Sequence, residues 1–303
     1  MDDVPTSSST DVRSAVSCRI CGEDVSVVGT RYGKYAGRPF TLGRCEACGF
    51  ACVTDPWLDY ESIYDEAYYQ GRGADPHVDY LAAVSSPATA TQRYEWRGVL
   101  RRVRSLATLE TTTPWLDYGC GVGGLVQYLR SEGLTDVLGF EQGWSERRLD
   151  DRNVPHLRSD ELDDRRGSFE IVTAIEVLEH ALDPVAELRR MRALMRPGGI
   201  LFVTTGNAKP FRDKLPTWQY VTPEVHISFF EPDTLANALR AAGFEPRFPG
   251  FGPGWSDLYR AKTLRTLGVH RVNLLERSVP WRVVARALEA KLHLAEQPLG
   301  VAS

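Results

Sequence analysis

Four cysteines near the N-terminus have the spacing of a metal site. Cys18 and Cys21 form one CxxC pair, Cys45 and Cys48 form a second, and a glycine directly follows each pair. Two residues between thiolates allow both sulfurs to bind one ion, and the glycine permits the tight turn that follows. The sequence therefore predicts a structural Zn²⁺ held by these four residues, with four free thiols as the alternative.

The chain between the two pairs contains two alternating segments, 25–32 and 38–42, which we expect to pair as a hairpin. A ribbon of this size has little core, so the metal would supply its folding free energy. Its basic and acidic residues nearly balance, and the acidic stretch DPWLDYESIYDEAYYQG follows it. Because such a stretch repels phosphates, we interpret the ribbon as structural or substrate-positioning.

A glycine-rich loop is the second motif, in the segment WLDYGCGVGGLVQYLRSEG. It follows a short apolar strand and precedes a helix that we expect to begin near Leu125. Glycines let the backbone approach a ligand, and the free amides of a helix start favour an anionic group. Glu141 ends the next apolar strand about 20 residues later, where nucleoside-binding folds place a carboxylate on the ribose hydroxyls. The spacing fits a nucleoside cofactor, although the glycines alone would also fit a dinucleotide or a turn without a ligand.

Composition limits the class of protein. The 303 residues are 43% hydrophobic and 25% charged, which suits one or two globular domains and excludes a disordered or collagen-like chain. A net charge of −4 provides no general attraction for nucleic acid or anionic lipid. The acidic start MDDVPTSSST does not resemble a secretory signal, and no apolar run approaches the roughly 20 residues of a membrane span. We therefore expect a cytoplasmic protein without membrane segments.

Several segments resemble, in order, the signatures of class I S-adenosylmethionine-dependent methyltransferases. LDYGCGVGG resembles their first motif, in which an acidic residue closes the first strand before GxGxG. FEIVTAIEVLEHALDP resembles their fourth strand with the acidic and histidine positions after it, MRPGGILFVTTGN the turn into the fifth strand, and HISFFEPDTLANALRAAGF the entry to the last large helix. The resemblance covers residues 106–251. It implies an α/β fold, a doubly wound Rossmann-like domain with a mostly parallel seven-stranded sheet.

Together with the CxxC pairs and YESIYDEAYYQG, the HISFF segment makes the chain look like bacterial methyltransferases that modify sugars or other natural products behind an N-terminal zinc module. We expect a zinc-ribbon module at 1–56, a helical tyrosine-rich linker or lid at 57–105 and the cofactor-binding methyltransferase domain at 106–303. Some sugar C-methyltransferases of this kind have a large additional C-terminal domain. The roughly 50 residues after Phe251 leave no room for one, which disfavours C-methylation.

The resemblance also implies roles for residues that bind S-adenosylmethionine. Asp117 would organise the amino group and Glu141 the ribose diol. Asp160, with its neighbour Glu161 as an equal candidate, would face the adenine edge. Gly119, Gly121 and Glu176 would line the methionine portion.

Two histidines are candidates for the base that accepts a hydroxyl proton, since an imidazole pKa near neutrality suits this task. His180 lies in the LEH turn at the carboxyl end of a strand, where open parallel sheets bind ligands. His226 lies in PEVHISFF, and related sugar methyltransferases place a catalytic histidine in a similar motif. We favour His226, with Glu224 as its partner. The alternative for both histidines is a purely structural role.

The predicted function is methylation of a small polar metabolite at a sugar or secondary-metabolite hydroxyl. Three alternatives remain: an RNA methyltransferase, which the near-neutral ribbon and acidic linker disfavour, a sugar C-methyltransferase, and a non-catalytic cofactor-binding scaffold. We expect a small-molecule acceptor as the partner rather than nucleic acid or a membrane. The sequence does not indicate the oligomeric state.

Overall fold

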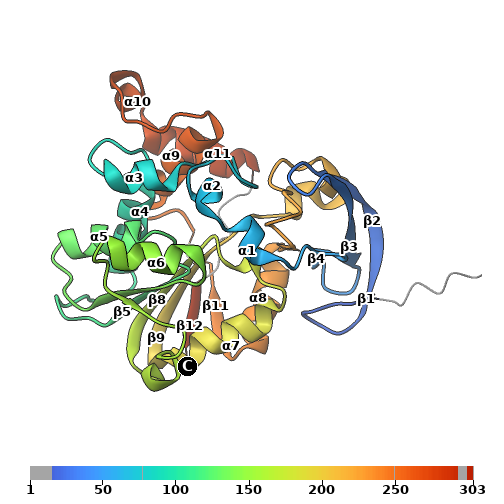
Figure 1. The fold of residues 1–303 in the computed structure, drawn as a ribbon, viewed down its shortest axis with the longest axis horizontal. Coiled ribbons are helices and arrows are strands. Elements are labelled where there is room, and N and C mark those ends of the chain that lie inside the picture. The colour runs from blue at the N-terminus through green and yellow to red at the C-terminus, as the bar shows by residue number, and fades with distance from the viewer. Residues whose placement is uncertain (1–15, 77, 249, 293–298, 303) are drawn as a thin grey trace, which may run out of the picture.

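The computed structural model describes residues 16–76, 78–248, 250–292 and 299–302. Two β-sheets organise this part of the chain: a small antiparallel sheet and a large, mostly parallel sheet (Figure 1). No helix among the described residues is both long and apolar enough to cross a membrane.

The large sheet has the strand order β11-β12-β9-β8-β5-β6-β7. The strands from β9 to β7 in this order are parallel, whereas β12 pairs antiparallel with both β9 and β11. The central strands are buried along most of their length, as expected for parallel strands covered on both faces. This arrangement confirms the predicted doubly wound α/β class. The strands are β5 (Trp115–Tyr118), β6 (Val137–Phe140), β7 (His156–Leu157), β8 (Phe169–Ile175), β9 (Met195–Thr204), β11 (Phe244–Arg247) and β12 (Leu299–Ala302).

Two hydrophobic cores lie on opposite faces of this sheet. On one face, strand residues such as Val172 pack with residues of α7 (Pro184–Leu194) and α8 (Pro232–Ala241). On the other face, Ile171 packs with residues of α4 (Arg93–Arg104), α5 (Gly124–Ser131), α6 (Trp144–Asp151) and α9 (Trp255–Thr266). Within the described residues, three 3₁₀ segments connect the elements: η1 (Asp163–Arg165), η2 (Leu178–His180) and η3 (Lys209–Thr217).

The small sheet has the order β1-β2-β3-β4-β10. Strands β2 (Asp24–Gly33) and β3 (Arg38–Cys45) form the antiparallel hairpin that the sequence predicted between the CxxC pairs. Strands β1 (Val16–Ser17) and β4 (Ala51–Val53) extend the sheet on either side. The last strand, β10 (Ser228–Phe229), comes from the segment just before α8 and pairs with β4. Strand pairing therefore crosses the proposed domain boundary at residue 56.

Side chains also join the ribbon to the large domain. Arg44 of β3 forms a buried ion pair of 3.0 Å with Glu231, which immediately precedes α8. The hydroxyl of Thr234 donates to the backbone oxygen of Cys48 at 2.6 Å. The rings of Phe50 and Phe230 lie 5.5 Å apart in a shared core. The ribbon is thus packed firmly against α8 and the loop before it.

Three short helices, α1 (Tyr60–Ile63), α2 (Glu66–Tyr69) and α3 (Tyr80–Ser85), follow the ribbon. The aspartate before each helix accepts a hydrogen bond from a backbone amide in the first turn, which explains why each helix begins where it does. In Figure 1, α1 and α2 lie between the two sheets. They are therefore well placed to form one wall of a site.

The C-terminal helices are α9, α10 (Leu274–Ser278) and α11 (Trp281–Leu292). Helix α9 begins in close contact with α4. A Cβ added to Gly254 would lie only 2.2 Å from the carbonyl oxygen of Gly98, so this position requires glycine. Arg265 of α9 also donates to both carboxylate oxygens of Glu95 in α4, at 2.9 and 3.1 Å. Helix α9 is thus fixed beside the large sheet.

Candidate functional site

The four predicted metal ligands meet at one end of the small sheet. Their sulfur atoms all lie within 4.8 Å of one another, and the Cys18–Cys48 and Cys21–Cys45 sulfur pairs are both 3.5 Å apart. Four thiolates at about 2.3 Å from one zinc ion would be separated by about 3.8 Å, so the donor set fits tetrahedral Zn²⁺. The amide of Ile20 also donates to the sulfur of Cys18 at 3.4 Å. These cysteines would hold a structural zinc ion.

A cavity of about 1560 Å³ lies beside the carboxyl ends of β5, β6 and β8. Its walls come from the tyrosine-rich helices α1 and α2, the glycine loop before α5, the segment after β8, the loop before β10 and the end of α9. This position is where open parallel sheets bind their ligands. Its volume is large enough for a nucleoside cofactor and a small acceptor together.

The glycine loop curves around one end of this cavity. Gly119 and Gly121 have positive φ angles of 74° and 54°, which only glycine adopts without strain. The carboxylate of Glu141 accepts hydrogen bonds from the amides of Gly121 at 2.8 Å and Gln142 at 2.9 Å. Burial raises the pKa of Glu141, and these two amides act in the opposite direction. Loop and carboxylate thus form one preorganised unit.

Asp117 lies at the end of β5 and is only 4% exposed. Its Oδ1 accepts from the Thr173 hydroxyl at 2.8 Å, and no basic side chain in the described ranges forms a salt bridge with it. Burial raises the pKa of Asp117 to about 7. A buried carboxylate without a cationic partner fits a ligand that carries an ammonium group, as the methionine portion of S-adenosylmethionine does.

The structure places Asp160 and Glu161 away from this cavity. Both side chains are exposed and neither lines it, although Asp160 follows the short strand β7 as the sequence predicted. Glu161 instead accepts from the amide of Arg158 at 2.8 Å. Gln142, Gly143 and Trp144, which follow Glu141 directly in the chain, also line the cavity.

Glu176 follows β8 and lines the cavity, with an unusual positive φ of 55°. It accepts from the Nζ of Lys262 at 2.8 Å and from the hydroxyls of Thr204 at 2.9 Å and Tyr220 at 3.2 Å. Burial acts to raise the pKa of Glu176, but the charges of Lys262 and Arg265 hold it at about 2. Glu176 is therefore an ionised anchor for α9. Nothing in the local sequence signalled the lysine, which comes from the C-terminal segment.

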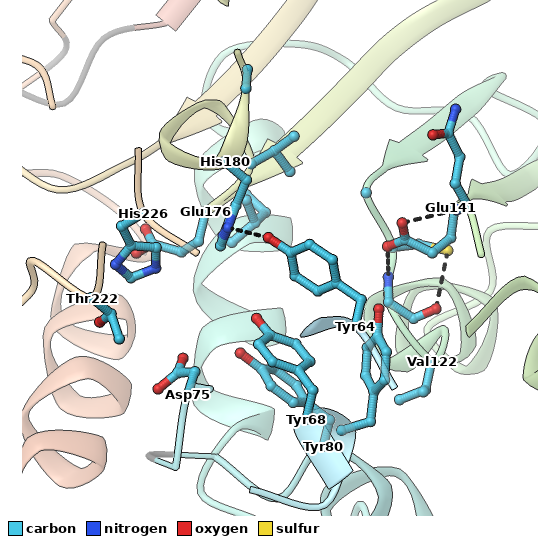
Figure 2. Close-up of a pocket in the computed structure, with 18 of the residues that line it drawn as sticks. Tyr64, Tyr68, Asp75, Tyr80, Val122, Glu141, Glu176, His180, Thr222 and His226 are labelled. Carbon is cyan, nitrogen blue, oxygen red and sulfur yellow. Dashed lines mark hydrogen bonds between the residues drawn. The ribbon is translucent and has the colours of Figure 1, made fainter. Parts of the chain in front are cut away.

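His180 and His226 lie together on the other side of the cavity from Glu141 (Figure 2). Their rings are 4.9 Å apart, and His226 also stacks on the ring of Tyr220 at 4.3 Å. His180 Nδ1 lies 2.9 Å from both the Tyr64 hydroxyl and the carbonyl oxygen of Val225. Burial and the neighbouring His226 lower the pKa of His180 to about 3. The structure thus brings both predicted histidines to one site, with a neutral His180.

Glu179, beside His180, is a residue that the sequence did not single out. It is fully buried, and its carboxylate accepts from the hydroxyl of Thr205 at 2.8 Å and from the hydroxyl of Tyr220. Burial and the nearby charge of Glu176 raise the pKa of Glu179 to about 8. Its backbone oxygen accepts from the amide of Ile227 at 2.7 Å, which ties the turn of His180 to the loop of His226.

Glu224 does not line the cavity. Its Oε1 accepts from the amides of Tyr35 at 3.0 Å and Ala36 at 3.2 Å, in the turn between β2 and β3. The side chain therefore points to the ribbon hairpin. The loop that carries His226 is held through Glu224 at one end and through β10 at the other.

The tyrosines in and next to α1 and α2, in the segment predicted as a linker or lid, pack on one another and also line the cavity. Tyr64 and Tyr68 meet edge to face at 4.9 Å, and Tyr68 stacks on Tyr80 at 6.1 Å. Tyr69 stacks on Trp144 at 5.2 Å, and its hydroxyl donates to Ser145 at 2.9 Å. Figure 2 shows the Tyr64 hydroxyl in contact with His180, and Tyr68 and Tyr80 next to Tyr64.

Comparisons with known proteins give the family of this domain. The family model described as a methyltransferase domain matches residues 89–247. A ubiquinone biosynthesis O-methyltransferase from Bordetella avium is 32% identical over 151 residues, which cover 43% of this chain and 61% of that protein. A protein of the same description from Acinetobacter baylyi is 29% identical over 155 residues, with 43% and 62% covered. The match thus spans less than two thirds of these curated relatives.

Among solved structures, an S-adenosylmethionine-dependent methyltransferase from Mesorhizobium loti aligns with 69% of this chain and 98% of its own, at 16% identity and a TM-score of 0.44. The matched domain of residues 89–247 spans more than half of the chain and contains the glycine loop, Glu141 and both histidines. The chain therefore belongs to the methyltransferase domain family.

Proposed function

We propose that this protein transfers a methyl group from S-adenosylmethionine to a hydroxyl of a small polar metabolite. One observation carries the proposal: the glycine loop with Asp117 and Glu141 and the pair of His180 and His226 face each other across one cavity. A cofactor held on the first side would present its methyl group to an acceptor held on the second. The name of the curated relatives, O-methyltransferases of ubiquinone biosynthesis, supports oxygen as the acceptor atom.

The cofactor supplies an activated methyl group on a sulfonium, so the protein mainly has to bind, align and exclude water. We assign Asp117 to the ammonium group, since its carboxylate is buried and forms no salt bridge with any described residue. Glu141 would accept from the ribose hydroxyls through the oxygens that now face the loop amides. Gly119 and Gly121 would let the backbone approach the methionine portion. We assign no cofactor contact to Asp160, because it does not line the cavity.

We assign activation of the acceptor hydroxyl to the histidine pair, with His226 as the principal residue. The Nδ1 of His226 lies 2.6 Å from the carbonyl oxygen of Tyr220 and must donate to it, so Nε2 is the basic nitrogen of the neutral ring. The low pKa of His180 keeps its ring neutral, suited to hydrogen bonding but not to storing a proton at neutral pH. Glu224 would position the His226 loop rather than take part in proton transfer.

The charge of the cavity narrows the substrate class. Carboxylic acids outnumber arginines among its lining residues, and tyrosines form one wall. An acidic, aromatic cavity suits a neutral or cationic acceptor and repels a polyanion such as RNA. A glycoside or a phenolic secondary metabolite fits these walls, through stacking on the tyrosines and hydrogen bonds to their hydroxyls.

Two measurements test the proposal. Calorimetry should show binding of S-adenosylmethionine and S-adenosylhomocysteine to the zinc-loaded protein. Mass spectrometry should then detect methylated product from a panel of glycosides and phenols. We expect His226→Ala to lower kcat by about 100-fold to 10,000-fold without preventing cofactor binding. His156→Ala, which changes a histidine outside the cavity, should leave the rate unchanged. Failure of the wild-type protein to bind either cofactor form would contradict the proposal.

A further inference from the structure

Three side chains with metal-binding atoms lie together at the acceptor end of the cavity: His180 and His226 line it, and Glu179 is fully buried next to them. One ligand atom from each of Glu179, His180 and His226 lies within 4.8 Å of the other two. Ligands about 2.1 Å from a shared ion would be separated by about 3 to 4 Å, so small side-chain rotations would complete the set. This cluster is separate from the four cysteines, and its ligands are nitrogen and oxygen rather than sulfur.

The backbone fixes both imidazoles in the form that binds metals. His180 Nδ1 lies 2.9 Å from the carbonyl oxygen of Val225, and His226 Nδ1 lies 2.6 Å from that of Tyr220. A carbonyl oxygen only accepts hydrogen bonds, so both Nδ1 atoms carry the proton and both Nε2 atoms have the lone pair. Metal-binding histidines typically donate their other ring N–H to such a carbonyl or carboxylate, which sets the tautomer and the ring orientation.

The third ligand, Glu179, is also held by hydrogen bonds, in this case from two hydroxyl groups. The two oxygens of Glu179 accept from Thr205 and Tyr220, and these bonds leave further lone pairs on the carboxylate. Tyr220 therefore supports two ligands, Glu179 through its hydroxyl and His226 through its carbonyl oxygen. Such support by neighbouring groups is typical of metal sites, where it holds the ligands in place.

We propose that Glu179, His180 and His226 bind a divalent transition-metal cation that coordinates the acceptor hydroxyl. This proposal rests on the proposed function and specifies how the histidine pair activates the hydroxyl: the pair holds a cation instead of taking the proton directly. Two nitrogens and one carboxylate leave coordination positions open for an acceptor oxygen. A diol or catechol, with two adjacent oxygens, would fill two such positions.

The chemistry balances without a further reactant. Binding to the cation lowers the pKa of the hydroxyl, so its O–H bond breaks and the proton leaves to solvent. The oxygen lone pair then forms the new O–C bond, and the electron pair of the broken C–S bond stays on sulfur. The cation neutralises the developing alkoxide, and no electrons are exchanged with it.

Manganese is a suitable probe, because it binds carboxylate and water oxygens in preference to thiolates, whereas the four cysteine thiolates select zinc. Electron paramagnetic resonance would count Mn²⁺ ions bound to the full-length protein in its complex with S-adenosylhomocysteine, with the zinc content measured on the same sample. We expect one Mn²⁺ per chain. His226→Ala and Glu179→Gln should each weaken Mn²⁺ binding at least about tenfold.

His156→Ala is the matched control. Its Nδ1 also lies 2.9 Å from a backbone oxygen, that of Val154, but it does not line the cavity. This variant should bind Mn²⁺ as the wild type does. Calorimetry with S-adenosylhomocysteine would show that each variant is folded, and His180→Gln provides a second ligand variant if Glu179→Gln does not fold.

Activity separates this proposal from the proposed function. Chelator treatment that leaves the zinc content unchanged should abolish methyl transfer, and added Mn²⁺ should restore it. No Mn²⁺ binding, equal binding in all variants, or full activity after chelation would overturn the cation proposal while leaving methyl transfer intact. Mn²⁺ binding that depends on Glu179 and His226 in a protein that methylates no acceptor would support the cation site and count against the proposed function.

Discussion

The affinity for S-adenosylmethionine should depend steeply on pH, because of Asp117. This carboxyl is buried, no basic side chain in the described part of the chain forms a salt bridge with it, and its pKa is raised to about 7. In the free protein it is therefore largely protonated below neutrality. The ammonium group of the cofactor favours the ionised form, so cofactor binding should release a proton at acidic pH.

The size of the effect follows from this pKa. If the pKa of Asp117 falls below 5 in the complex, each pH unit below 7 weakens binding about tenfold, so Kd rises on the order of 100-fold between pH 7.5 and pH 5. Above about pH 8 the α-amino group of the cofactor loses its own proton, and affinity should fall again. The expected profile is a maximum near pH 7.5.

Calorimetry at pH 6 in two buffers with different ionisation enthalpies measures the protons released directly. We expect nearly one proton per cofactor bound to the wild type. Asp117→Asn should remove the acidic limb and weaken binding at pH 7.5 by about 10-fold to 100-fold, the cost of one charged hydrogen bond. Thr173→Val is a milder companion variant: it removes the neutral donor to Asp117 and also the acceptor of the Trp115 indole N–H.

The free energy of unfolding should also depend on the ionisation of Asp117. A carboxyl whose pKa is raised in the folded state opposes folding once the pH exceeds its unfolded value of 3.8. The contribution of Asp117 to the free energy of unfolding should thus fall between about pH 4 and 7, and Asp117→Asn should remove that loss. A wild-type Kd that stays flat from pH 5 to 7.5, or an acidic limb that persists in Asp117→Asn, would refute the reasoning.

Three further predictions concern stability. Cys45→Ser should lower the zinc content below one ion per chain, as measured by atomic absorption, and lower the melting temperature, because the ribbon depends on its metal. Glu231→Gln should destabilise the protein by about 3 kcal/mol in urea unfolding, since it removes the negative charge that balances the buried Arg44 guanidinium, whereas Asp55→Asn in an exposed pair should cost less than about 1 kcal/mol. Gly254→Ala would collide with the oxygen of Gly98 and require an unfavourable φ of 84°, so α9 should become susceptible to limited proteolysis at lower temperature.

Short sequence patterns correctly predicted the features that depend on residues close together in the chain. Each CxxC pair, and the order of strand, glycine loop and helix around Gly121, depends on residues within a few positions of one another. Glu141 could be predicted because the second strand of such folds follows at a nearly fixed distance. The CxxC pairs, the glycine loop and Glu141 can therefore be predicted from the sequence without knowledge of the tertiary contacts.

Features that depend on distant contacts could not be predicted. Lys262 reaches Glu176 only because α9 docks on α4, and the sequence around Lys262 has no motif. Glu224 precedes His226 by two residues, yet the ribbon hairpin captures its carboxylate. Two residues that are near in sequence can therefore have different partners. Here the backbone amides of the turn between β2 and β3 need an acceptor, and Glu224 provides it.

The small sheet also could not be completed from the N-terminal sequence, since its last strand consists of two residues from a remote segment. Ser228 and Phe229 match no strand pattern by themselves. Their pairing with β4 depends on the loop after His226 being held in place, which a reading of either segment alone does not reveal.

The pairing of Cys52 with Ser228 has a consequence for biosynthesis. A chain that emerges N-terminus first exposes the edge of β4 until residues 228–229 have been made, roughly 10 to 35 s later at ordinary elongation rates. During this interval the edge is open to other strands, and zinc captured early would limit its freedom. We therefore expect zinc supply during synthesis to affect the yield of folded protein more strongly than zinc added to the purified chain.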